Sequence, residues 1–298
     1  MQGRYIDENE KKFYAGTVID PTPRIRLEDG SSELTMRAMD LIAPIGMGQR
    51  GLIVAPPGSG KTTFLKHLCQ AVTKSAPDVK LFCLLIDERP EEVTDFRRSV
   101  PKGAEVCWSS SDETYEHHIS TADVLMKQVY REVAGGANVM VLIDSLTRLT
   151  RVHNADMRSS GRTLSGGVDA RALEIPRRIF GSARKIENGG SLSILATILV
   201  STGSRMDDII FEEFKGTGNM EIYLSREVSS RRIYPALDIA KSGTRKEERL
   251  LEPAELEQVH RARQALAGLG TVEAAKALVD TLQKFPTNKA LLTAISKI

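Results

Sequence analysis

Short apolar runs with strand character, separated by amphipathic stretches, dominate the chain from Gly51 onward. The apolar runs lie at Leu52–Ala55, Leu81–Asp87, Val139–Asp144, Ser193–Ser201 and Met220–Leu224. Helical patterns fill the gaps, notably Lys61–Ser75 and Thr114–Ala134. Apolar strands that alternate with helices predict an α/β fold, in which helices flank a mostly parallel central sheet. Ligands of such sheets bind beyond the carboxyl ends of the strands, so site residues are expected there.

The pattern changes at both ends of this alternating region. Residues 1–45 are polar, with turn signals at Pro21–Pro23 and Asp29–Gly30, and are predicted to be an irregular lead-in segment. Residues 46–250 form the predicted core. In residues 251–298 the strands stop, and three helical patterns predict a small C-terminal helical subdomain: Ala254–Leu266, Val272–Lys284 and Asn288–Ile298.

Charge and cysteine content narrow the classes of function. The formal net charge is +2, from 41 basic and 39 acidic side chains, so a nucleic-acid site would have to be a local cluster of cations. Three dispersed cysteines (Cys69, Cys83 and Cys107) argue against a disulfide framework or a structural zinc site. No apolar stretch approaches the roughly 20 residues that cross a bilayer, and the N-terminus lacks a signal-peptide pattern. We therefore expect a cytoplasmic protein with no membrane partner.

The segment from Ala55 to Thr62, APPGSGKT, matches the phosphate-binding pattern GxxxxGK[ST], except that Ala55 replaces the first glycine. An apolar strand precedes it and a helix follows, as this pattern requires; the alternative is a glycine-rich turn with an incidental lysine. Backbone N–H groups can hold the phosphates of ATP, Lys61 can neutralise them and the Thr62 hydroxyl can bind Mg²⁺. The predicted nucleotide-binding residues of this loop are Pro57, Gly58, Ser59, Gly60, Lys61, Thr62 and Thr63.

Two further apolar runs end in carboxylates. Asp144 closes the run from Val139, a position that suits the Walker B acid that holds Mg²⁺. Glu88 follows the run from Leu84 and can polarise the water that attacks the γ-phosphate. Arg89 could orient Glu88 or sense the γ-phosphate. A glutamate on the strand that follows the P-loop helix distinguishes RecA-like ATPases from GTPases and kinases, so the sequence predicts a RecA-like P-loop ATPase.

Six segments carry a more specific resemblance. They are GQRGLIVAPPGSGKT (48–62), LLIDERPEEVTDF (84–96), LIDSLTRL (142–149), LSGGVDARAL (164–173), EEFKGTGNMEIYLSR (212–226) and KSGTRKEE (241–248). Together they resemble the motor domain of the transcription termination factor Rho family, in one consistent order from about Asp40 to the C-terminus. DERPEEVT and EEFKGTGNM are the most specific of these, because general P-loop ancestry would not explain them.

This resemblance implies an ATP-dependent RNA helicase that translocates 5′→3′ along single-stranded RNA and drives transcription termination. It implies a homohexamer with ATP at the subunit interfaces and RNA in the central pore, and RNA polymerase and elongation factors as further partners. By position, Lys61 and Thr62 are the P-loop residues, Glu88 the catalytic glutamate and Asp144 the Walker B acid. The remaining correspondences are Arg245 as the arginine finger, Arg232 as a second interface arginine and Tyr234 as the ring that stacks on adenine.

The resemblance also assigns RNA contacts to two loops. The first corresponds to the family's Q-loop and the second, at residues 201–205, to its R-loop. Six copies of each loop would line the pore with cations while the net charge of one chain stays low. The predicted RNA-binding residues are Arg162, Thr163, Leu164, Ser165, Gly166, Gly167 and Val168 in the first loop, and Ser204 and Arg205 in the second.

The chain departs from the family pattern in three places. Gly58 stands where the family usually carries a P-loop lysine. Arg162 and Arg205 replace lysines, which keeps the charge but changes the hydrogen-bond geometry. No N-terminal region with an OB-fold, which carries the primary RNA-loading site in the family, precedes the motor. We therefore expect a truncated or naturally short form with an intact motor.

Three other functions remain open at this point, of which a recombinase-type DNA-binding ATPase is the weakest. A rotary ATPase catalytic-type subunit has a similar core with a glutamate–arginine pair, although its N-terminal β-barrel and the loops above do not match. A nucleotide-binding regulatory ring that never hydrolyses ATP is disfavoured by the presence of Glu88, Asp144 and Arg245. Stimulation of ATP hydrolysis by RNA separates these functions from an RNA motor.

Overall fold

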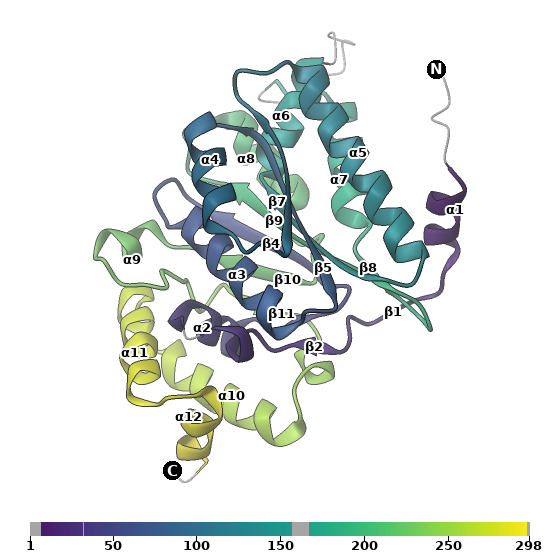
Figure 1. Ribbon diagram of the computed structural model, residues 1–298. Helices are drawn as coiled ribbons and strands as arrows, with labels where there is room; N and C mark the ends of the chain where they lie inside the picture. Colours follow the sequence, from purple (N-terminus) through teal and green to yellow (C-terminus); the bar gives the residue numbers. More distant parts are fainter. Residues whose placement is uncertain (1–6, 32, 157–166, 297–298) are drawn as a thin grey trace.

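A twisted sheet runs through the centre of the computed structural model, which describes residues 7–31, 33–156 and 167–296 (Figure 1). Within these residues nine strands form the main sheet, whose path is β11-β10-β4-β9-β7-β5-β6, with β8 beside β9 and β1 beside β8. Every pair from β10 to β6 along this path is parallel, and β11, β8 and β1 pair antiparallel. The predicted mostly parallel α/β sheet is confirmed. The strands are β1 (Val18–Ile19), β4 (Arg50–Ala55), β5 (Val79–Glu88), β6 (Ala104–Ser110), β7 (Asn138–Asp144), β8 (Arg184–Ile186), β9 (Ser191–Leu199), β10 (Met220–Tyr223) and β11 (Gly243–Thr244).

Helices cover both faces of this sheet (Figure 1). Alternate residues of a strand point to opposite faces, and β4 shows the result. Its Leu52 and Val54 join the core under α5 to α8, whereas Ile53 and Ala55 join the core under α2 to α4. Burial on both faces explains why the central strands are continuous apolar runs rather than alternating ones. The helices on these two faces are α2 (Leu34–Ile42), α3 (Lys61–Ser75) and α4 (Pro90–Ser99), and α1 (Glu8–Ala15), α5 (Tyr115–Ala134), α6 (Leu146–Asp156), α7 (Glu174–Gly181) and α8 (Arg205–Phe214).

The long helices begin and end close to their predicted limits. The helix α3 has the predicted bounds, and Gly60 precedes it in the left-handed conformation, with φ +91°. The helix α5 begins after Thr114, whose hydroxyl accepts the N–H of His117 at 3.3 Å and so caps the first turn. The three C-terminal helices are also confirmed, as α10 (Pro253–Ala267), α11 (Thr271–Lys284) and α12 (Asn288–Ile295). None of the helices in the described ranges combines the length and apolarity needed to cross a bilayer.

Residues before 46 are more ordered than the sequence predicts. The helices α1 and α2 have only 8 and 9 residues, so their apolar periodicity is too short to stand out among turn signals. Phe13 of α1 packs against Tyr130 of α5 with ring centroids 4.7 Å apart. The helix α2 buries eight of its residues against the core. A second, two-stranded sheet of β2 (Arg24–Ile25) and β3 (Ile45–Gly46) closes the segment. The expected irregular lead-in is therefore an integral part of the fold.

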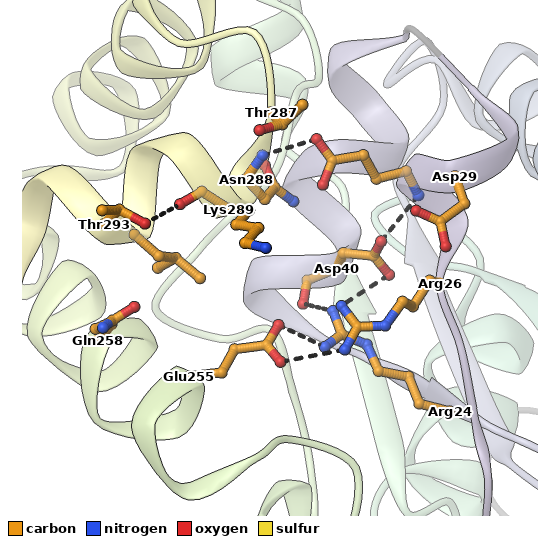
Figure 2. Close-up of a pocket in the computed structure, with 12 residues that line it drawn as sticks. Arg24, Arg26, Asp29, Asp40, Glu255, Gln258, Thr287, Asn288, Lys289 and Thr293 are labelled. Carbon is orange, nitrogen blue, oxygen red and sulfur yellow. Dashed lines mark hydrogen bonds and ion pairs between the residues drawn. The ribbon is translucent and has the colours of Figure 1, made fainter.

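A network of buried charges ties the C-terminal helices to this N-terminal segment (Figure 2). Arg24 donates to Glu255 Oε1 at 2.7 Å and to the Asp40 carbonyl at 3.0 Å. The Asp40 carboxylate accepts the N–H groups of Leu27 and Glu28 at 3.1 and 2.8 Å. Burial raises the pKa of Asp40 to about 6, although Arg24 opposes the shift. These contacts form the floor of a cavity of about 700 Å³ between the two parts of the chain.

Candidate active site

The predicted phosphate loop joins the carboxyl end of β4 to α3. Gly58 and Gly60 adopt left-handed conformations, with φ +75° and +91°, which only glycine adopts without strain. Ser59 donates its hydroxyl to the Pro56 carbonyl at 2.7 Å, and the Gly58 carbonyl accepts the Ser229 hydroxyl at 3.1 Å. The backbone at Gly58 thus gives a physical reason for glycine where the resemblance leads one to expect lysine. The loop turns as a phosphate-binding loop must, and it positions Pro57 to Thr63 at one end of the sheet.

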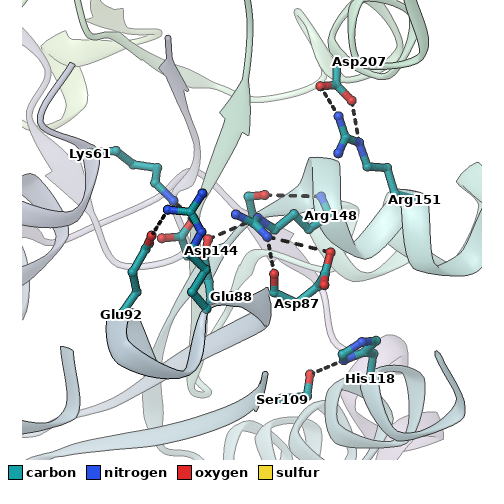
Figure 3. Close-up of polar contacts among 12 residues, drawn as sticks. Lys61, Asp87, Glu88, Glu92, Ser109, His118, Asp144, Arg148, Arg151 and Asp207 are labelled. Atoms are coloured by element: carbon teal, nitrogen blue, oxygen red, sulfur yellow. Dashed lines mark hydrogen bonds and ion pairs between the residues drawn. The ribbon is translucent and has the colours of Figure 1, made fainter. Parts of the chain in front are cut away.

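Lys61 lies between the two predicted carboxylates (Figure 3). Its Nζ is 2.5 Å from Asp144 Oδ1 and 3.3 Å from Glu88 Oε1. The strands β5 and β7 are neighbours in the sheet, with Leu85 opposite Asp144, so both carboxylates emerge at the same edge. Burial lowers the pKa of Lys61, but the two carboxylates outweigh burial and hold it above its ordinary value. The structure therefore brings Lys61, Glu88 and Asp144 together at the edge where ligands of parallel sheets bind.

A bulge in β5 directs Glu88 into this site. The pairing with β6 shifts between Ile86 and Glu88, and Asp87 between them has φ +56°. Glu88 is 3% exposed, and burial, followed by the nearby Asp144, raises its pKa to about 7. Its Oε2 is buried and has no hydrogen-bond partner among the described residues. This oxygen is free to accept a hydrogen bond from a water molecule.

Arg148 contacts Glu88, and the sequence reasoning missed it. The Nε of Arg148 is 3.3 Å from Glu88 Oε1, and its guanidinium also donates to the Asp87 carbonyl (Figure 3). Arg148 lies in the first turn of α6, whereas Glu88 ends β5, so no spacing along the chain signals their contact. Arg89, which was predicted to orient Glu88 or to sense the γ-phosphate, has an exposed side chain that pairs with Glu92 at 3.3 Å.

An exposed aromatic ring lies beside the phosphate loop. A methyl group added at Gly60 would lie 3.8 Å from the ring of Tyr234. Tyr234 is 48% exposed, and its hydroxyl donates to the Ser229 carbonyl at 3.4 Å. Arg232, two residues earlier, is exposed and left-handed, with φ +60°. An open aromatic face next to the loop can stack on a nucleotide base.

Arg245 lies at the opposite edge of the sheet from Lys61. Thr244 of β11 pairs with Met220 of β10, which pairs with Gly51 near the amino end of β4. The phosphate loop begins after Ala55, four residues further along β4, which corresponds to about 13 Å at the usual strand rise. The Arg245 guanidinium donates to the Gly216 carbonyl at 3.5 Å. The structure therefore does not bring Arg245 to the phosphate loop of the same chain.

The structure describes all of the second predicted RNA loop but only the last residues of the first. Arg162, Thr163, Leu164, Ser165 and Gly166 lie outside the described residues. Gly167 is left-handed, with φ +80°, and Val168 is fully buried. Ser204 precedes α8, and Arg205 is the exposed first residue of that helix, just beyond the carboxyl end of β9. The second loop therefore lies at the same edge of the sheet as Lys61.

Comparison with known proteins agrees with this geometry. Residues 35–244 match the nucleotide-binding domain of the ATP synthase alpha/beta family. Transcription termination factor Rho of Aquifex aeolicus is 51% identical over 98% of this chain and 67% of its own length. Rho of Mycobacterium tuberculosis strain H37Rv is 48% identical over the whole chain, which spans 49% of that relative. A type III secretion system ATPase of pathogenic bacteria has the same fold, with 22% identity and a TM-score of 0.76 over 94% of this chain and 85% of its own.

Proposed function

Because the chain belongs to the transcription termination factor Rho family, we propose that it is an RNA-dependent ATPase that translocates 5′→3′ along single-stranded RNA and drives transcription termination. The observation that carries the proposal is the meeting of Lys61, Glu88 and Asp144 beside the phosphate loop. These residues come from three different elements, and together they supply the charges that ATP hydrolysis requires. The chain spans between about half and three quarters of the length of the curated relatives it matches, so the activity of the whole protein is part of the proposal.

In this mechanism Glu88 polarises the attacking water. Its free Oε2 accepts the hydrogen bond from that water, and Arg148 orients the carboxylate through Oε1. Lys61 turns from the two carboxylates to the β- and γ-phosphates, and the face of Tyr234 stacks on the adenine. Thr62 and Asp144 offer the hard oxygen atoms that suit Mg²⁺, which would neutralise charge on the phosphates when bound.

Arg245 acts on the site of a neighbouring chain. Its position supports this role, because it lies at the opposite ends of the strands from Lys61 of its own chain. An arginine supplied by a neighbour contributes on the order of 10³–10⁵ to the rate of related phosphoryl transfers. A homohexameric ring satisfies this requirement for every chain, with Arg232 as the second interface arginine.

The loops at residues 201–205 and 160–168 bind the RNA in this proposal. The exposure of Arg205 at the edge that also holds Lys61 supports this assignment. An arginine there can bind an RNA phosphate or a 2′-hydroxyl. Because Arg205 and the phosphate loop both follow carboxyl ends of neighbouring parallel strands, RNA bound at Arg205 has a way to influence hydrolysis.

The test is the rate of ATP hydrolysis with and without pyrimidine-rich single-stranded RNA, alongside a mass measurement in solution. We expect RNA to stimulate hydrolysis by the assembled chain, and Arg205→Ala to reduce that stimulation while nucleotide binding persists. Equal rates with and without RNA would indicate a rotary-type subunit. No hydrolysis under either condition would indicate a nucleotide-binding regulatory ring.

A further inference from the structure

A threonine on the neighbouring strand also contacts the Walker B acid. The Thr197 hydroxyl lies 2.7 Å from Asp144 Oδ1. Thr197 is fully buried, and Asp144 is 4% exposed. The strands β7 and β9 are paired, with Ile143 opposite Ala196, so the two side chains leave adjacent strands at the same edge. The contact is therefore fixed by the sheet rather than by a mobile loop.

The Thr197 hydroxyl donates its hydrogen bond to the Asp144 carboxylate. Thr197 Oγ1 also lies 3.3 Å from the Ile143 carbonyl, but the Asp144 oxygen is closer and charged, and a hydroxyl has only one proton to donate. Lys61 Nζ reaches the same oxygen at 2.5 Å. Among the described residues both donors thus converge on Oδ1. The other oxygen, Oδ2, receives neither of these two hydrogen bonds and could serve Mg²⁺ when the ion is bound.

The two donors differ in what they do when nucleotide binds. Lys61 is required by the phosphates, so it cannot remain on Asp144, whereas Thr197 has no other role at the site. We propose that Thr197 is the positioning residue that keeps Asp144 oriented for Mg²⁺ once Lys61 turns to the nucleotide; this inference rests on the proposed function. Thr197 is fully buried and is therefore not placed to contact nucleotide itself. It acts only through Asp144.

The test compares Thr197→Val with the native chain in binding of the fluorescent nucleotide mant-ATP, titrated with Mg²⁺ and repeated in EDTA. Valine keeps the branched shape that β9 packs but removes the donor. We expect unchanged nucleotide affinity in EDTA and a Mg²⁺ half-saturation concentration raised roughly 10- to 100-fold, as for other residues that hold a metal ligand. Thr197→Ser, which retains the hydroxyl, restores the native value.

A matched control is available in the first turn of α6, against the same strand β9. Thr147 is also fully buried, and its hydroxyl accepts the Leu199 N–H at 2.8 Å without touching Asp144. We expect Thr147→Val to lower the melting temperature but to leave the Mg²⁺ requirement unchanged. A native Mg²⁺ requirement in Thr197→Val, an equal shift in Thr147→Val or no restoration by serine would each overturn the proposal. Because binding is measured, a failure of RNA-stimulated hydrolysis would contradict the proposed function separately.

Discussion

At the scale of single residues, the groups around the two oxygens of Glu88 determine its charge state. Oε1 is held by Lys61 and Arg148, and Oε2 is buried without a partner among the described residues. Burial and the neighbouring Asp144 favour the protonated form, and the two cations favour the charged form. The balance leaves a carboxyl group whose charge changes near neutral pH, which suits a group that must accept a hydrogen bond from water.

This balance predicts the pH dependence of hydrolysis. The pKa of Glu88 is about 7, and only the ionised form polarises water, so kcat/KM for ATP should rise with pH through about 7. Arg148→Gln removes a cation that lowers this pKa, and the midpoint should therefore move to higher pH. The measurement is kcat/KM from pH 5.5 to 9 in the presence of RNA, since this ratio reports groups of the free protein.

Glu88→Gln provides the control for this prediction. It cannot ionise, so we expect hydrolysis to fall by about 10²- to 10⁴-fold with no remaining rise near pH 7. A profile that keeps its midpoint in Glu88→Gln, or in Arg148→Gln, would assign the titration to another group.

At the scale of elements, the strands that carry Glu88 and Asp144 could be predicted because both of their faces are buried. The edge strand β6 could not, since its sequence AEVCWSS is only partly buried and mixes apolar with polar residues. The helix α3 was predictable from a long amphipathic pattern, whereas α1 and α2 were too short to show one. The contact of Arg148 with Glu88 depends on how α6 sits against the bulge in β5. That arrangement is tertiary, so spacing along the chain could not indicate it.

The buried carboxyl group of Asp40 in α2 predicts a pH-dependent stability. The Asp40 carboxyl has its pKa raised from 3.8 to about 6 by burial, so the folded state binds a proton more tightly than the unfolded state. Its contribution to the free energy of unfolding is fully present below about pH 3.8 and is lost as the pH rises through about 6, a change of up to about 3 kcal/mol. The measurement is urea unfolding between pH 4 and 7.

Asp40→Asn isolates this contribution because it cannot titrate. Other carboxylates change the stability of both proteins alike, so the native-minus-variant difference in unfolding free energy should fall as pH rises from 4 to 7. A difference that stays constant over this range would contradict the assignment to Asp40.

At the scale of the whole molecule, the separation of Arg245 from Lys61 predicts complementation between inactive chains. Arg245→Ala lacks the arginine that we propose acts on a neighbour, and Lys61→Ala lacks the lysine of its own phosphate loop. In mixed assemblies some interfaces pair an intact Lys61 with an intact Arg245, so hydrolysis should recover partly, whereas each variant alone stays inactive. The measurement is the ATPase rate across mixing ratios, with mixed assembly verified by mass. Absence of recovery at every ratio would exclude a shared site.

The same separation means that the number of complete sites depends on whether the assembly is a closed ring. If every complete site lies between two chains, n chains in a closed ring contain n sites, and the same chains in an open arc contain n − 1. One end of the arc keeps a phosphate loop without an arginine, and the other keeps an arginine without a phosphate loop. Opening the ring to admit a strand of RNA would therefore inactivate one site and leave the other sites intact. Closing the ring would complete that site again.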